Sequence, residues 1–156
     1  DLHLSIRRQR QMCIRDSDRT VRGMIVDYVG VLDEDVETQR RWRQLFEVAR
    51  KEGVALAILS NDPGGPGAEE IREWEYRGIV DAVVLSGEVG AEKPTEEAFQ
   101  AAADAINLPL SDCVLVDDSI LNIRGAVEAG MVGVFYQQFD RAVVEITGLF
   151  DIDGEF

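Results

Sequence analysis

Polar residues that could do chemistry stand just past apolar stretches of this chain or at the start of expected helices. Asp27 directly follows the apolar residues 24–26, and Asp117 and Asp118 directly follow residues 113–116. Three carboxylates in one place repel one another unless a cation neutralises them, and Mg²⁺ prefers such oxygen ligands. A carboxylate in this position can also act as a covalent nucleophile, as in enzymes that pass through an aspartyl-phosphate.

Ser60, Asn61 and Lys93 add groups that can donate hydrogen bonds to an anion. Ser60 and Asn61 follow the apolar run 55–59, and their backbone N–H groups suit phosphoryl oxygens. Lys93, just before Pro94, would balance a developing negative charge and hold Asp27 ionised. Taken singly, Ser60 and Asn61 are also consistent with a plain turn, and Lys93 with a solvated surface lysine.

The elements that must position these groups alternate along the chain. Apolar runs predict strands at 21–26, 54–59, 82–85, 113–116 and 132–136, and helical spacing predicts helices at 37–52, 68–77, 96–106, 121–129 and 141–149. Continuous apolar runs are typical of strands buried on both faces. We therefore expect an α/β fold: a single Rossmann-like, doubly wound parallel sheet of about five strands with helices on both faces. Ligands of such sheets bind beyond the carboxyl ends of the strands, where the polar residues above fall.

The domain prediction places one domain at residues 18–150, a length that allows a hydrophobic core. Residues 1–17 have no helical stripe, and residues 12–17 resemble a translated sequencing adapter, so we interpret this segment as a non-native leader. A disordered tail or a targeting peptide is the alternative, although a secretory signal needs an apolar core that this segment lacks. Residues 151–156 are interpreted as an acidic tail.

The charge balance and the scarcity of histidine and cysteine exclude several classes of function. The chain has 30 acidic against 16 basic residues and a formal net charge of −14, which argues against a nucleic acid partner. No apolar run approaches the roughly 18 residues of a membrane span, so we expect no membrane partner. His3, the one histidine, and Cys13 lie in the leader. Cys113, which we expect in the core, permits by itself no disulfide, and a cytoplasmic location is the simplest context.

Four motifs in order make residues 21–149 resemble the haloacid dehalogenase superfamily. The motifs are Asp27 to Leu32, Leu59-Ser60-Asn61, Lys93-Pro94, and Val114 to Ser119 with Asn122, Gly125 and Gly130 beyond it. The resemblance implies that Asp27 is the catalytic nucleophile, and that Ser60, Asn61 and Lys93 bind the phosphoryl group, with Ser60 and Lys93 also catalytic. It implies a Mg²⁺ cofactor held by Asp27, Asp117 and Asp118 and by the backbone carbonyl of Val29.

Two departures from the family pattern bear on activity. Family phosphatases have a second aspartate where this chain has Val29, and general acid–base help of that kind contributes about 10²–10⁴ in rate. The segment 33–53 and the segment after Asn61 each have room for little more than one helix. We therefore expect a capless member with an open crevice, beside which the loop 62–67 is the best candidate for a substrate-facing element.

The function expected from the sequence is that of a Mg²⁺-dependent hydrolase of this superfamily acting on a phosphoryl group through an aspartate nucleophile. The first alternative is a catalytically impaired pseudoenzyme that binds a phosphorylated ligand or partner protein. The second is a dehalogenase-type hydrolase acting at carbon. The expected partners are a phosphorylated small molecule or protein, and a second copy of the chain in a homo-oligomer that covers the open site.

Overall fold

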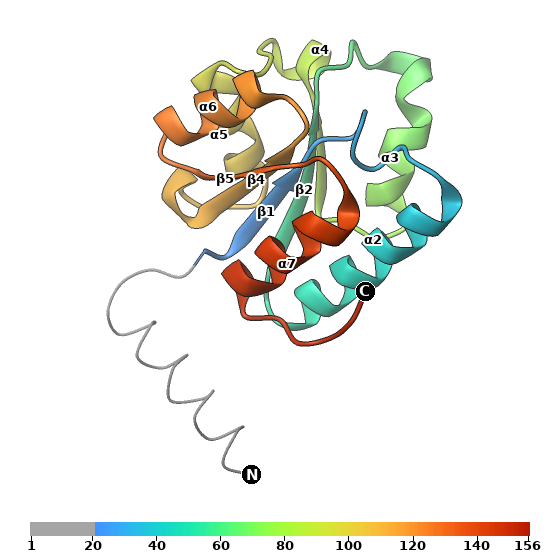
Figure 1. Cartoon of the computed structure of the whole chain (residues 1–156). Helices are drawn as coiled ribbons and strands as arrows, with labels where there is room; N and C mark the ends of the chain where they lie inside the picture. The colour runs from blue at the N-terminus through green and yellow to red at the C-terminus, as the bar shows by residue number, and fades with distance from the viewer. Residues whose placement is uncertain (1–20) are drawn as a thin grey trace.

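A five-stranded parallel sheet forms the centre of the computed structural model, which describes residues 21–156 (Figure 1). Its strands are β1 (Gly23–Val26), β2 (Ala55–Ser60), β3 (Ala82–Leu85), β4 (Cys113–Asp117) and β5 (Val132–Phe135), in the order β3-β2-β1-β4-β5. Every neighbouring pair is parallel. The chain moves outward from β1 to β3 and then crosses to β4 on the other side of β1. The strand order therefore reverses between β1 and β4, which is where ligands of such sheets bind.

Helices cover both faces of the sheet (Figure 1). α2 (Val36–Lys51), α3 (Glu69–Tyr76) and α7 (Phe139–Phe150) pack on one face, and α5 (Glu96–Ala105) and α6 (Ile120–Glu128) pack on the other. The described residues also form a one-turn helix, α4 (Ser86–Val89), and two 3₁₀ turns, η1 (Gly65–Ala68) and η2 (Leu110–Asp112). The predicted fold class is confirmed.

Strand β1 shows why the run before Asp27 is apolar at every position. Met24 and Val26 belong to the core on the α2 side, Ile25 belongs to the core on the α5 side, and none of the three is more than 1% exposed. Successive side chains of a strand point to opposite faces, and here both faces are covered. Asp27 is the first residue beyond this strand, so its carboxylate is delivered to the carboxyl edge of the sheet.

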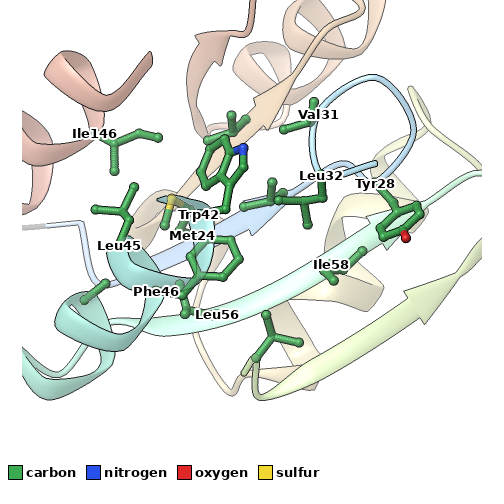
Figure 2. Packing of buried hydrophobic residues seen from close by; sticks show 14 of the residues in the cluster. Met24, Tyr28, Val31, Leu32, Trp42, Leu45, Phe46, Leu56, Ile58 and Ile146 are labelled. Atoms are coloured by element: carbon green, nitrogen blue, oxygen red, sulfur yellow. The ribbon is translucent and has the colours of Figure 1, made fainter. Parts of the chain in front are cut away.

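Trp42 holds helix α2 against the sheet and the neighbouring helix α7 (Figure 2). Its ring centroid lies 5.4 Å from that of Phe46, 5.8 Å from that of Tyr136 and 5.0 Å from that of Phe139. Such aromatic pairs add about 0.5–1.5 kcal/mol each beyond the burial of their area. Trp42, Trp74 and Tyr136 are all buried in this core, where they act as packing residues.

The ends of the elements differ from the sequence predictions by up to two residues, and one helix was missed. β1 begins at Gly23 rather than at residue 21, although the N–H of Arg22 still donates to the carbonyl of Asp112 at 2.8 Å. α7 begins two residues early because the buried Phe139 packs on Trp42. α4 has only four residues, too few to give a periodic pattern.

Residues 151–156, which were predicted as an acidic tail, lie back against the core. Ile152 is buried and its N–H donates to the carbonyl of Thr147 at 2.9 Å, while Phe156 packs on the core and its carbonyl accepts from Arg41. Within residues 21–156, no helix is both long and apolar enough to cross a membrane. The predicted leader at residues 1–17 lies outside the described residues.

Candidate active site

Three carboxylates meet at the carboxyl ends of β1 and β4. Val26 pairs with Val116 in the sheet, so Asp27 and Asp117 reach the edge at the same level. One carboxylate oxygen each from Asp27, Asp117 and Asp118 lie within 4.8 Å of one another. Asp117 is fully buried, Asp27 is 7% exposed, and Asp118 is exposed. Oxygen ligands at this spacing match the donor set that Mg²⁺ prefers.

Lys93 is buried among these carboxylates. Its Nζ donates to Asp27 Oδ1 at 2.9 Å, to Asp117 Oδ2 at 2.8 Å and to the carbonyl of Leu59 at 2.9 Å. An ammonium has three donors, so all of them are used. Its side chain is 1% exposed, which excludes the solvated surface lysine considered from the sequence.

Asn61 holds the backbone of Lys93 in place. Its side-chain Oδ1 accepts from the N–H of Lys93 at 2.9 Å, and its Nδ2 donates to the carbonyl of Lys93 at 3.1 Å. The two residues are 32 positions apart, so nothing in the sequence around either of them reveals the contact. The side chain of Asn61 therefore positions Lys93, a role in addition to the phosphate-binding one expected from the sequence.

Asp117 is fixed by the start of helix α6. Its Oδ1 accepts from the N–H of Ser119 at 2.9 Å, and its Oδ2 accepts from Asn122 Nδ2 at 3.2 Å as well as from Lys93. The hydroxyl of Ser119 caps the helix by accepting from the N–H of Asn122 at 3.3 Å. Ser119 and Asn122 thus take part both in the cap of α6 and in the orientation of the Asp117 carboxylate.

Burial raises the pKa of Asp27 to about 7 from its ordinary value of 3.8; the Lys93 ammonium opposes the rise, and the charge of Asp117 adds to it. Asp27 Oδ1 accepts both from Lys93 and from the N–H of Tyr28, the latter at 2.9 Å. The negative carboxylates thus outnumber the single buried ammonium at this edge of the sheet. A bound cation would favour the ionised form of Asp27.

The remaining predicted site residues also lie at this edge. Ser60 is the last residue of β2 and is 1% exposed. Ile58 pairs with Val26 of β1, so Ser60 stands two residues further toward the carboxyl edge. Val29 is 61% exposed and lies in the turn that follows Asp27. The structure therefore brings every residue of the predicted site to one end of the sheet.

The loop 62–67 is attached to the helix that sequence reasoning missed. The carbonyl of Asp62 accepts from the N–H of Gly87 at 2.9 Å and from Ser86 Oγ at 3.2 Å. A Cβ on Gly87 would lie only 2.1 Å from the carbonyl oxygen of Pro63, so glycine is required there for the close approach. Helix α4 thus fixes the start of this loop beside Ser60.

Similarity to known proteins agrees with this geometry. The family model for haloacid dehalogenase-like hydrolases matches residues 6–130. The phosphatase MT3486 of Mycobacterium tuberculosis (strain CDC 1551 / Oshkosh) is 32% identical over 90 residues, 57% of this chain and 42% of that protein. The sesquiterpene phosphatase astK of Aspergillus oryzae (strain ATCC 42149 / RIB 40) is 28% identical over 95 residues, 60% of this chain and 48% of that protein. The chain thus matches less than half of the length of either relative.

A solved structure shares the whole architecture. The crystal structure of an uncharacterized protein from Corynebacterium glutamicum is 71% identical, with a TM-score of 0.86, and the match covers 87% of this chain and 99% of that one. The order of the motifs, the sheet that presents them and the matching family model point to one assignment. This chain belongs to the haloacid dehalogenase-like hydrolases.

Proposed function

We propose that this protein is a Mg²⁺-dependent phosphatase-type hydrolase whose nucleophile is Asp27 and whose substrate is a phosphorylated small molecule or protein. The observation that carries the proposal is that Lys93 bridges Asp27 and Asp117, while Asp118 completes a cluster of three carboxylates. The phosphatase names of two relatives support it at the level of the family.

The charges of the cluster fit a divalent cation. With all three carboxylates ionised, Lys93 neutralises one charge and leaves two, which is the charge of Mg²⁺. Asp27, Asp117, Asp118 and the backbone carbonyl of Val29 would hold the ion, and all offer oxygen. When bound, the ion would supply charge neutralisation between the attacking carboxylate and the phosphoryl oxygens.

The chain's own residues have separate tasks in this proposal. A carboxylate oxygen of Asp27 forms a bond to phosphorus while the bond from phosphorus to the leaving oxygen breaks, and water then hydrolyses the aspartyl-phosphate. Ser60 donates a hydrogen bond to the transferred group, and Lys93 offsets its negative charge. Val29 supplies no proton to the leaving oxygen, so leaving groups that depart without one are favoured.

A catalytically impaired protein that binds a phosphorylated ligand or partner protein is the second candidate, and Val29 is the observation that favours it. Hydrolysis at carbon ranks lower, because it does not need a cluster of three carboxylates that could hold a cation. The same proposal includes an open site without a cap module. Within the described residues, α2 is the only helix or strand between β1 and β2, so no cap is inserted there.

Hydrolysis of p-nitrophenyl phosphate with Mg²⁺ or with a chelator tests the proposal, since its leaving group needs no proton. We expect slow, Mg²⁺-dependent release that Asp27→Asn abolishes. Asp104→Asn, the same change at an exposed position of α5, is the matched control and should leave the rate unchanged. Equal rates for Asp27→Asn and the wild type would exclude Asp27 as the nucleophile.

A further inference from the structure

Exposed apolar side chains gather at the catalytic edge of the sheet. Of the nine large hydrophobic residues that are exposed within residues 21–156, six lie at the carboxyl ends of the strands or at the first turns beyond them: Val29, Val36, Val89, Ile120, Leu121 and Phe135. The other three stand further along helices, Tyr76 at the end of α3, Val127 near the end of α6 and Val144 within α7. An exposed apolar patch that polar residues surround is typical of a binding surface.

Four of these residues are close to the site carboxylates in the sequence or in the register of the sheet, and we call them the apolar rim: Val29, Ile120, Leu121 and Phe135. Val29 follows Asp27 by two residues, and Ile120 and Leu121 follow Asp118 by two and three. Phe135 pairs with Asp117 in the register of β4 and β5. The exposed fractions of the four are 61%, 49%, 64% and 41%. A molecule that binds over the rim therefore lies beside the end of the sheet that carries Asp27, Asp117 and Asp118.

Acidic side chains limit what that molecule can be. Asp33, Glu34 and Asp35 follow the turn after Val29, and Asp62 follows Ser60 and Asn61. A second copy of the chain would bring the same acidic edge and a further net charge of −14, so two such edges would repel. A substrate with several phosphates or carboxylates meets the same repulsion.

We propose that the apolar rim binds the hydrocarbon part of a phosphate monoester, so that the site takes monoesters with an apolar, uncharged body. This inference rests on the proposed function, because it assigns a substrate class to the same site. It also gives Val29 a role, because this exposed residue offers methyl groups two positions after Asp27. Each methylene group that the rim buries fully would strengthen binding about fourfold.

Binding of non-hydrolysable n-alkyl phosphonates tests the inference without turnover. Ethyl, hexyl and decyl phosphonate, below their micellar concentrations, are titrated into the wild-type chain with Mg²⁺ by calorimetry. We expect the Kd to fall about tenfold or more from ethyl to decyl phosphonate. Leu121→Ser and Phe135→Ser should each raise the Kd for decyl phosphonate about threefold or more. Both variants should leave the Kd for ethyl phosphonate unchanged.

Val144→Ser is the matched control, because Val144 is 70% exposed on α7 away from the rim. A Kd that does not depend on chain length, or an equal loss in Val144→Ser, overturns the inference. So does sedimentation as a dimer that Leu121→Ser dissociates, because the rim is then an interface between copies.

Hydrolysis separates this inference from the proposed function. Longer phosphonates could bind more tightly while neither p-nitrophenyl phosphate nor decyl phosphate releases phosphate. This result would support apolar binding by the rim and contradict the proposed phosphatase activity. Mg²⁺-dependent hydrolysis with no effect of chain length on binding or on kcat/KM supports the phosphatase and contradicts the rim.

Discussion

Gly30 and Asp118 are in close contact: a Cβ added to Gly30 would lie 2.2 Å from Asp118 Oδ2, so this carboxylate would have to move away. Gly30 also has a φ of +84°, a region that glycine adopts without strain. The N–H of Gly30 donates to Asp33 Oδ1 at 2.7 Å, so the turn has a fixed shape. The exposed carboxylate of the cluster therefore rests against the turn that follows Asp27.

Gly30→Ala should weaken Mg²⁺ binding through this contact. Gly53→Ala is its control, because Gly53 has a similar φ of +87° and nothing within 4 Å of an added Cβ. Both variants should lose about 1–2 kcal/mol of unfolding free energy from the left-handed backbone. Only Gly30→Ala should raise the Kd for Mg²⁺, measured by calorimetry, by about tenfold. Equal Mg²⁺ affinities in the two variants would refute the role of the contact.

Lys93→Met should strongly destabilise the protein. The change removes the ammonium that lies 2.8 Å from Asp117 and 2.9 Å from Asp27 and leaves these buried carboxylates without a cationic partner, at a cost of about 3–5 kcal/mol. Lys51→Met is the control, since its pair with Glu47 is exposed and contributes about 0.3–0.5 kcal/mol. Urea unfolding at neutral pH measures both. Similar losses in the two variants would mean that Lys93 does not stabilise the cluster.

Stability of the metal-free protein should fall as the pH rises toward 7. The folded pKa of Asp27, about 7, is above its ordinary value of 3.8, so the folded state binds this proton more tightly than the unfolded state. The resulting stabilisation is complete below about pH 4 and is lost as the pH rises through 7, at roughly 1 kcal/mol per pH unit. Unfolding with a chelator at pH 5, 6, 7 and 8 should show this slope in the wild type and a flatter one in Asp27→Asn.

With Mg²⁺ bound, the stability of the folded protein should rise with pH instead of falling. The ion requires ionised ligands, so the affinity of the protein for Mg²⁺ rises with pH. Calorimetry in two buffers of different ionisation enthalpy should detect release of about one proton per ion near pH 6 and none near pH 9. An affinity that is constant from pH 6 to pH 9 would contradict the assignment of Asp27 as a ligand.

Val29→Asp should raise turnover by restoring a proton donor two residues after the nucleophile. We expect an increase in kcat on the order of tenfold or more for alkyl phosphates, whose leaving groups need a proton, and a smaller one for p-nitrophenyl phosphate. Val144→Asp adds the same charge on α7 and should change neither rate. An inert wild type with an active Val29→Asp variant would favour the pseudoenzyme. No gain in kcat for either substrate would contradict the inference that the lack of a general acid at position 29 limits turnover.

The sequence by itself determined the sheet, its helices and which polar residues stand at the carboxyl ends of the strands. Apolar runs such as residues 113–116 and helical stripes such as Trp42, Leu45, Phe46 and Ala49 are local patterns, because a strand or helix face is built from nearby residues. The parallel order of the strands then brings Asp27, Ser60 and Asp117 to one edge without further information.

Only the tertiary structure decided how these residues are held and charged. The two hydrogen bonds between Asn61 and Lys93, the contact of Gly30 with Asp118, and the burial that raises the pKa of Asp27 all join segments far apart in the chain. The same holds for Ile152 and Phe156, whose acidic neighbours suggested a tail although both pack on the core. Local patterns carry no record of these contacts, because each depends on the exact distance between elements that are placed only when the core is packed.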